Sequence, residues 1–348
     1  MSYKVLALKW RPNSFEDVLG QNHITKSLKN AIELQRISHA FTFTGPRGVG
    51  KTTTARILAK ELNGISDLNS SFDVIEMDAA SNRGIDEIRN LRENASIVPA
   101  HGKYKIYIID EVHMLTKEAF NALLKTLEEP PKNVIFILAT TDPYKIPATI
   151  LSRTQRFDFR RLTDDDIIKQ LEIVLESESK KYEYSSLKVI AQKSEGSMRD
   201  ALGYLDQILN YCLNEIKESD VCLALGIVDE DLYLSLFNNI LNKSTIKALN
   251  LISETIDSGV SVKDFTLGFN RFLRKVLLNV INKDFNENKK VDKKNISELD
   301  IARFMELMMQ FEAKVKFYSN PDQALEVFIV KLCNLDSIVD LSEIINSI

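Results

Sequence analysis

Residues 45–52, with the sequence GPRGVGKT, have the residue types and spacing of a phosphate-binding loop. Three glycines in eight residues let the backbone turn so that successive N–H groups point inward, where they can donate to phosphate oxygens. The Lys51 ammonium group can reach the β- and γ-phosphates of a nucleotide, and the Thr52 hydroxyl can ligate Mg²⁺. The loop therefore predicts a nucleoside triphosphate site, for which a plain glycine-rich turn is the alternative.

A pair of acids follows about sixty residues later, at the end of the apolar run 106–109. In open α/β sheets ligands bind at the carboxyl ends of the strands, which is where Asp110 and Glu111 are expected. Asp110 would hold Mg²⁺, directly or through water, and Glu111 would orient and partly deprotonate an attacking water. On its own such a pair is more often a solvated turn. Beside a phosphate loop it predicts ATP hydrolysis rather than binding alone.

Four further polar residues, at three places in the chain, are candidates for the same chemistry. Thr140 and Thr141 end the apolar run 134–139, where a hydroxyl can sense a γ-phosphate, although threonine is common at strand ends. Arg153 follows a short predicted helix and is either a surface arginine or a finger that neutralises charge at a neighbouring subunit's γ-phosphate. Arg199 stands in the first turn of a predicted helix, where a cation is electrostatically unusual. It indicates either an anionic partner, here ATP, or a salt bridge to a nearby acid.

The elements that position these residues alternate between two periods. Strands are predicted at 39–44, 72–77, 105–110, 133–141 and, as a shorter edge strand, 155–159. Between them, apolar residues at helical spacing predict helices at 51–62 and 116–128, the second with Thr116 as N-cap. Strands that alternate with helices imply parallel βαβ units and a sheet covered on both faces. The fold class is therefore α/β over the first 160 residues.

After residue 162 the strand pattern stops and the chain is predicted to be helical to its end. Thr163, followed by three aspartates, is typical of a helix N-cap with acids in the first turn. Ser197 is a second predicted N-cap. Residues 282–294 are highly charged and predict an exposed loop. Domain boundaries are expected near 162 and 227.

The 348-residue chain is 44% hydrophobic and 27% charged, with three scattered cysteines. These values are ordinary for a globular protein and exclude a disulfide framework or a four-cysteine zinc site. No apolar stretch is long enough to span a membrane, and the first residues lack a secretory signal, so a cytoplasmic protein is expected. The formal charge of −4 is uneven. Residues 1–162 are net positive and the rest net negative, so the first part is able to face phosphates.

Taken together, the motifs closely resemble one family, the bacterial clamp-loader motor or gamma/tau subunit of DNA polymerase III. The resemblance is carried, in order, by residues 9–21, 45–63, 78–89, 108–131, 138–153 and 195–202. It implies a AAA+ P-loop ATPase domain with a parallel sheet sandwiched by helices (residues 1–162). A three-helix lid (163–227) and an all-α oligomerising collar (228–348) would follow. The resemblance places the chain in the polymerase holoenzyme, although no polymerase active site is recognisable in it.

The resemblance also implies roles residue by residue. Lys51 and Thr52 match the family's Walker A residues, while Asp110 and Glu111 match Walker B. Thr141 matches sensor 1, Arg199 matches sensor 2, and Arg153 matches the finger that acts in trans. The nucleotide-binding positions implied are Ala7, Arg11, Pro12 and Val18 at the adenine, and Gly45, Pro46, Arg47, Gly48, Val49, Gly50, Lys51, Thr52, Thr53 and Arg199 at the phosphates.

The implied cofactors are ATP and Mg²⁺, and the implied partners are delta and delta-prime subunits, the sliding clamp, primed DNA and further copies of this chain, with no membrane. ATP binding would open the clamp and hydrolysis would release it closed on the duplex. Arg83, Arg89 and Arg92 are candidates for contacts with the DNA backbone, or else form a solvated basic face.

Two departures from the family pattern matter. The family usually carries a four-cysteine zinc knuckle after the phosphate-loop helix, whereas here residues 64–71 lack cysteine, so no zinc is expected. The motif cysteine after Arg153 is replaced by Thr154. The family's long tau-type extension is not part of these 348 residues, so a gamma-like chain is expected.

Two other functions remain as alternatives. One is a different AAA+ DNA-processing motor, such as a Holliday-junction helicase subunit, although the pairing of TLEEPP with GSMRDAL disfavours it. The other is a non-hydrolysing clamp-loader scaffold, which predicts a degraded phosphate loop. Here Gly50, Lys51, Thr52 and Asp110 are all intact.

Overall fold

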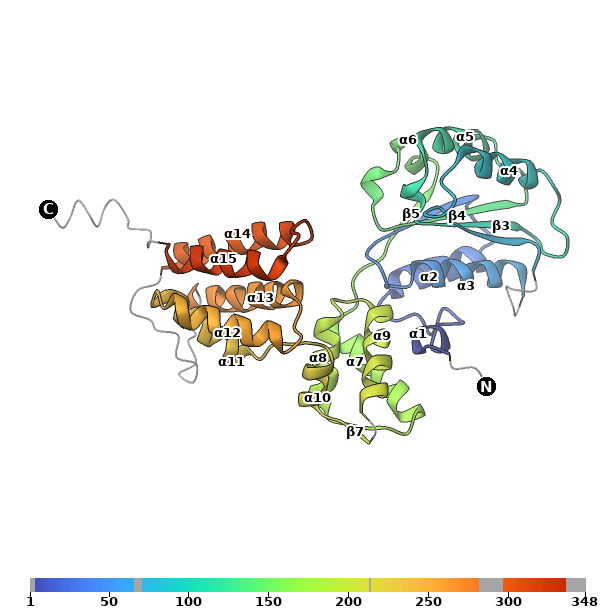
Figure 1. Ribbon diagram of the computed structural model, residues 1–348. Helices are drawn as coiled ribbons and strands as arrows, with labels where there is room; N and C mark the ends of the chain where they lie inside the picture. The colour runs from blue at the N-terminus through green and yellow to red at the C-terminus, as the bar shows by residue number, and fades with distance from the viewer. Residues whose placement is uncertain (1–3, 66–70, 213, 282–296, 336–348) are drawn as a thin grey trace. The chain divides into compact units, whose positions relative to one another are not determined.

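The computed structural model describes residues 4–65, 71–212, 214–281 and 297–335. The chain divides into two compact units, Met1–Glu218 and Ser219–Ile348 (Figure 1). Each unit has a hydrophobic core of its own.

The first unit is built on a five-stranded sheet in which every neighbouring pair is parallel. Its strand order is β2-β3-β4-β1-β5. The strands are β1 (Ala40–Thr44), β2 (Val74–Asp78), β3 (Lys105–Asp110), β4 (Val134–Thr140) and β5 (Gln155–Asp158). All five were predicted to within two residues at each end, and β4 starts and stops one residue inside the predicted run. The short β5 is an edge strand, as predicted.

Helices cover both faces of this sheet, as Figure 1 shows. Because successive side chains of a strand point to opposite faces, each strand contributes to two cores. On one face Phe41 and Phe43 pack with α2 (Asn22–Glu33) and α3 (Lys51–Asn63). On the other face Tyr107 stacks on Phe136 beneath α4 (Ile85–Ala95) and α5 (Lys117–Glu128). The central strands β1, β3 and β4 are therefore buried on both faces, and the polar groups that these strands offer for chemistry lie at their ends.

Short elements complete the sheet-bearing part of this unit. They are α1 (Leu6–Lys9), the 3₁₀ turns η2 (Val112–Met114) and η3 (Pro143–Lys145), and α6 (Ala148–Leu151). The predicted N-cap of α5 is confirmed, since the Thr116 side chain accepts a hydrogen bond from the Ala119 amide.

Helices α7 (Asp164–Ser177), α8 (Tyr184–Lys193), α9 (Met198–Tyr211) and α10 (Glu218–Ala224) follow the sheet. Thr163 and Asp166 form a capping box at the start of α7, and the Ser197 side chain accepts from the Asp200 amide at the start of α9, so both predicted N-caps are confirmed. The prediction that no strand follows residue 162 was wrong. The two-residue strands β6 (Lys181–Tyr182) and β7 (Glu215–Ile216) pair in parallel. They are too short for a period-2 pattern to reveal.

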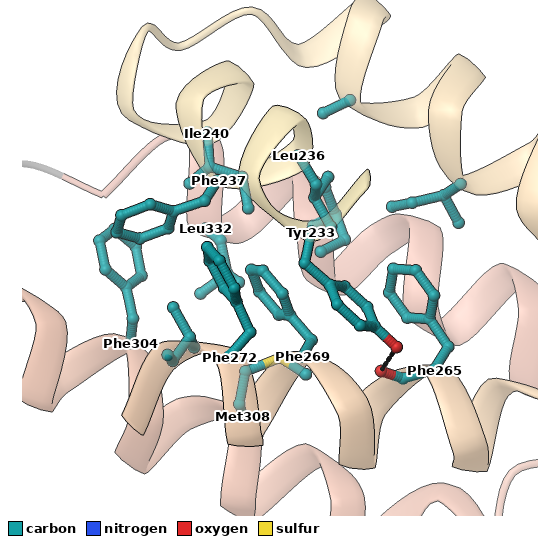
Figure 2. Packing of buried hydrophobic residues seen from close by; sticks show 14 of the residues in the cluster. Tyr233, Leu236, Phe237, Ile240, Phe265, Phe269, Phe272, Phe304, Met308 and Leu332 are labelled. Atoms are coloured by element: carbon teal, nitrogen blue, oxygen red, sulfur yellow. Dashed lines mark hydrogen bonds between the residues drawn. The ribbon is translucent and has the colours of Figure 1, made fainter. Parts of the chain in front are cut away.

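The second unit is a bundle of long helices, α11 (Glu230–Leu241), α12 (Thr245–Asp257), α13 (Val262–Ile281), α14 (Glu298–Val315) and α15 (Pro321–Cys333). Figure 2 shows the aromatic centre of its core, where Tyr233 from α11 lies among phenylalanines of α13. The Tyr233 hydroxyl donates to the carbonyl of Phe265 at 3.4 Å. The charged loop predicted at 282–294 lies outside the described residues.

Among the residues that the structure describes, no helix is both long and apolar enough to cross a membrane.

Candidate nucleotide site

The phosphate loop joins β1 to α3 through three glycines with positive φ. These are Gly45 (142°), Gly48 (75°) and Gly50 (99°), the last being the N-cap position of α3. The second reason for glycine at position 45 is space, because a Cβ there would lie 2.4 Å from the carbonyl oxygen of Phe159. The predicted strand, loop and helix are therefore all present, and the loop amides lie at the positive end of the α3 dipole.

Lys51 is buried, and its ammonium group lies inside the curve of the loop. Its Nζ donates to the carbonyl oxygens of Gly45 at 2.8 Å and Pro46 at 2.7 Å. Burial lowers the pKa of Lys51, while the nearby carboxylates of Glu111 and Asp110 partly oppose this. The loop thus holds a cation at its centre, which suits a polyanion of the size of a triphosphate.

The two oxygens expected to face Mg²⁺ lie together at the end of β3. The Thr52 hydroxyl donates to Asp110 Oδ2 at 2.7 Å, and Asp110 Oδ1 accepts from the Glu111 amide at 2.9 Å. One hydroxyl and one carboxylate match the sparse protein ligation of nucleotide-bound Mg²⁺, whose other ligands are phosphates and water. In the described part of the chain, no cluster of three or more His, Cys, Asp or Glu side chains is arranged to hold a metal.

Glu111 lies in a network that joins β3 to β4. It adopts a left-handed conformation, with φ at 46°, which is uncommon for a residue other than glycine. Its Oε2 accepts from the Thr141 hydroxyl at 2.9 Å and from the Thr141 amide at 3.2 Å. The structure thus brings the predicted water-orienting acid and the predicted γ-phosphate sensor into direct contact.

His113 belongs to the same network and was missed by the sequence analysis. Its Nδ1 lies 3.2 Å from Glu111 Oε2 and 3.1 Å from the Thr140 hydroxyl. The sequence contains a pattern that could have indicated His113, because residues 110–113 read DEVH. The turn η2 brings this histidine, three residues after Asp110, back to the end of the strand. The imidazole ring of His113 therefore bridges the Glu111 carboxylate and the Thr140 hydroxyl.

The first turn of α9 packs against the phosphate loop at Gly48. The Met198 amide donates to the Gly48 carbonyl at 3.1 Å, which places Arg199 beside the loop. A Cβ on Gly48 would lie 3.2 Å from the Cβ of Arg199. Arg199 therefore approaches the phosphate loop from the helical segment that follows the sheet.

The N-terminal segment flanks the same loop. Arg11 Nε donates to the Thr53 hydroxyl at 3.2 Å. Burial lowers the pKa of Arg11, and the neighbouring cations Arg56 and Arg199 act in the same direction. The other predicted adenine-side residues are placed on or near this segment, with Ala7 in α1, Pro12 just beyond it, and Val18 buried. Of the remaining loop residues, Val49 is buried, while Pro46 and Arg47 lie in the turn itself.

Arg153 does not belong to this cluster. It follows α6 and precedes β5, whose first residue, Gln155, pairs with Phe41 near the start of β1. The phosphate loop leaves the opposite end of β1, so Arg153 lies at the amino ends of the strands. The predicted DNA contacts are also separate from the loop. Arg83 Nε donates to the carbonyl of Ala80, Arg89 pairs with Asp86 at 3.1 Å, and Arg92 lies in the last turn of α4.

Comparison with known proteins gives one consistent family. Residues 66–163 match the model for the DNA polymerase III delta subunit, and 166–214 match the DNA polymerase III clamp loader subunit ATPase lid domain. Residues 216–348 match domain III of DNA polymerase III subunits gamma and tau. DNA polymerase III subunit gamma of Buchnera aphidicola subsp. Schizaphis graminum is 35% identical over 95% of this chain and 98% of its own length. The chain belongs to the DNA polymerase III gamma/tau family.

Longer relatives support the same assignment, and one solved structure shows the same fold. DNA polymerase III subunit tau of Bacillus subtilis is 40% identical over 99% of this chain, and that of Escherichia coli is 43% identical over 75% of it. The chain spans 66% and 43% of those two proteins. The Thermotoga maritima RuvB branch migration motor covers 66% of this chain with a TM-score of 0.52 and 21% identity. At that identity it shows the fold alone, a parallel sheet with helices on both faces. The resemblance inferred from the sequence is confirmed.

Proposed function

We propose that this gamma/tau family member is the ATP-hydrolysing motor of a clamp loader, which uses ATP to open a ring-shaped clamp and load it on primed DNA. The observation that carries the proposal is the contact between Thr52 and Asp110 at 2.7 Å, next to a buried Lys51 inside the phosphate loop. A subunit that only served as a scaffold would not need a hydroxyl, a carboxylate and an ammonium group kept together at one strand end. The same proposal includes the partners that the family resemblance implies, which are delta and delta-prime subunits, the sliding clamp and further copies of this chain.

Each residue has a defined task in this proposal. The loop amides and Lys51 bind the β- and γ-phosphates, while Ala7, Pro12 and Val18 border the base. Thr52 and Asp110 would hold Mg²⁺, which when bound supplies positive charge against the developing charge of phosphoryl transfer. Glu111 accepts a proton from, and orients, the water that attacks the γ-phosphate.

Thr141 and Arg199 are proposed to make the site responsive to the nucleotide. Thr141 touches Glu111, so a hydroxyl drawn toward a γ-phosphate would change the hydrogen bonding of the acid that handles the water. Arg199 comes from α9 and joins that helix to the phosphates. Arg153 stands at the far end of the strands and is proposed to act on the nucleotide of a neighbouring subunit.

We further propose that function divides at the predicted boundaries, with residues 1–162 as the ATPase domain, 163–227 as the lid and 228–348 as the collar. Arg83, Arg89 and Arg92 are proposed to follow the phosphate backbone of DNA without reading bases. The absence of a zinc module stays a prediction, because residues 66–70 of the shortened segment lie outside the described residues.

The nucleotide site is tested by removing the ammonium group. Lys51→Ala should lower ATP affinity at least about 100-fold in the presence of magnesium, because it removes the charge-assisted contact to the phosphates. Lys60→Ala, on the same helix but in its last turn, is the matched control and should leave the affinity unchanged. Isothermal titration calorimetry measures both. Wild-type affinity in Lys51→Ala would refute the assignment of this site.

The motor role requires a second measurement. Glu111→Gln should bind ATP normally but lose most of the hydrolysis that clamp, primed DNA and delta-type subunits stimulate in the assembled complex. If clamp, primed DNA and delta-type subunits do not stimulate ATP hydrolysis by the wild-type complex, the clamp-loading role is contradicted, even if ATP binds as expected.

A further inference from the structure

The turn that carries Arg153 is anchored on its inner side by the sheet. The Ser152 amide donates to the carbonyl of Ala148 at 2.9 Å, and the Arg153 amide donates to that of Ile150 at 3.0 Å, so the turn continues α6. The Thr154 hydroxyl lies 2.7 Å from the hydroxyl of Thr42 on the buried strand β1. The backbone of Arg153 is thus fixed before its side chain is considered.

The guanidinium group is itself held by three contacts. Its Nη1 donates to the carbonyl of Thr149 at 2.8 Å and lies 3.2 Å from the Ser152 hydroxyl. Its Nη2 lies 2.8 Å from Glu128 Oε1. A guanidinium carries five N–H groups in one plane. These contacts, the ones found in the described part of the chain, engage three of them and leave two for a partner.

Glu128 reaches this position because the hydrophobic core brings two helix ends together. It is the last residue of α5, and its neighbour Leu127 is buried in the same core cluster as Ile150 of α6. Packing of Leu127 and Ile150 therefore sets the separation between the end of α5 and the turn after α6. The carboxylate and the guanidinium meet as a result of this packing.

Stability does not explain the pair. The Arg153 and Glu128 side chains are 35% and 49% exposed, and ion pairs this open to solvent contribute little to folding. What the pair does achieve is orientation, since an arginine at a surface otherwise samples many rotamers. A group that must reach the reacting phosphate of another molecule gains rate when its orientation is set beforehand.

We propose that Glu128 is a positioning residue for Arg153, which it holds in the orientation that presents the guanidinium to the nucleotide of a neighbouring subunit. The inference rests on the proposed action of Arg153 in trans. The Glu128 carboxylate pairs with Nη2 of the guanidinium group, and the Thr149 carbonyl accepts a hydrogen bond from Nη1. The remaining N–H groups therefore keep a fixed direction. Glu128 itself does not touch the nucleotide.

The test measures ATP turnover in the assembled complex with clamp and primed DNA. Glu128→Ala should lower kcat about tenfold and leave KM for ATP unchanged, because only the orientation of the finger is lost. Glu128→Gln keeps an oxygen that accepts a hydrogen bond and should lose only about threefold. Glu129→Ala is the matched control. This neighbouring acid is also exposed, its side chain makes no hydrogen bond or ion pair with the described residues, and its removal should leave kcat unchanged.

A double-mutant cycle separates positioning from a structural effect. In an Arg153→Ala background, Glu128→Ala should cause no further loss, because the group it positions is gone. An equal tenfold loss in both backgrounds, or a Glu128→Ala variant as active as Glu129→Ala, would overturn the inference. If Glu128→Ala unfolds at a lower temperature, Glu128→Gln in the same cycle gives the answer. Full turnover in Arg153→Ala alone would overturn the trans role and this inference with it, whereas loss in Arg153→Ala without coupling to Glu128 would overturn only the inference.

Discussion

Substitution of Gly48 by alanine tests whether the phosphate loop and α9 are as closely joined as the structure shows. Gly48 has a φ of +75°, and a Cβ built on it would lie 1.9 Å from the Ser197 hydroxyl oxygen and 3.0 Å from the Ser197 Cβ. That hydroxyl is the N-cap of α9, where it accepts a hydrogen bond from the Asp200 amide. The added methyl group therefore displaces the cap, and with it the first turn of the helix.

The expected loss follows from three contributions. An alanine in the left-handed region costs about 1–2 kcal/mol, loss of a serine N-cap costs about 1 kcal/mol, and loss of the Met198 to Gly48 backbone hydrogen bond costs about 1 kcal/mol. Gly64 offers the matched control, because its φ is +62° and a Cβ there has no neighbour within 4 Å. Gly64→Ala should show only the first contribution. The excess for Gly48→Ala is then about 2 kcal/mol, or about 4–8 °C in Tm for a domain of this size.

The assay uses the single tryptophan of the chain, Trp10, which is the C-cap of α1 in the first unit. Its fluorescence follows thermal unfolding of that unit without a signal from the second. Calorimetric titration with ATP should in addition show weaker binding for Gly48→Ala than for Gly64→Ala. Equal Tm and equal ATP affinity in the two variants would refute the reasoning that α9 is seated on the loop.

Two predictions concern other parts of the fold. Burial raises the pKa of Asp73, but its hydrogen bonds from the amides of residues 100–102 outweigh this and bring the pKa below its usual value. Its stabilising effect is therefore fully present well above pH 3.8 and lost as the pH falls through the folded-state pKa, so Asp73→Asn should cost about 2 kcal/mol at pH 7 and less at pH 3 in urea unfolding. A gap of the same size at both values would contradict this. In the second unit, Gly268→Ala would place a Cβ 2.0 Å from the Tyr233 phenol oxygen and should destabilise by about 1–3 kcal/mol in unfolding followed by circular dichroism. Gly203→Ala, on α9 with no atom within 4 Å, should instead stabilise by about 0.5–1 kcal/mol, and a Gly268 variant that behaved like it would show that the aromatic core is less tightly packed than described.

Features encoded by neighbouring residues were predictable from the sequence. The strands β3 and β4 contain continuous apolar runs, because both faces of a parallel sheet are buried. The N-caps Thr116 and Thr163 depend only on groups three residues away, the Ala119 amide for the first and the Asp166 amide and side chain for the second. The phosphate loop is predictable for the same reason, since all of its atoms come from one short segment. Features that are formed by residues close together in the chain are therefore visible as patterns in the sequence.

Contacts between distant segments were not predictable in this way. The pairing of β6 with β7 joins residues 34 positions apart through two residues each, which leaves no periodicity. His113 and Glu128 contribute through what they touch, and their partners are set by packing of elements that lie apart in the sequence. The resemblance to a known family supplied roles for Thr141 and Arg199. It did not supply the hydrogen bonds that place them.

The connection between the sheet and the helices after it is more rigid than a plain linker. Gln21 is fully buried, and its side-chain amide both donates to the Arg160 carbonyl at 2.8 Å and accepts from the Arg160 amide at 3.2 Å, as an added strand would. Across the site, the Met198 amide donates to the Gly48 carbonyl. The start of the helical segment is thus tied to the sheet-bearing part by a pair of backbone-directed bonds, and the segment is joined to the phosphate loop by a single backbone hydrogen bond. The Gly48 peptide belongs to the loop that would grip a triphosphate, so this hydrogen bond joins that loop to the backbone of α9 rather than to a flexible side chain. For the motor role proposed above, in which the nucleotide state must be felt outside its own site, this hydrogen bond is a direct link from the phosphate loop to the helical segment.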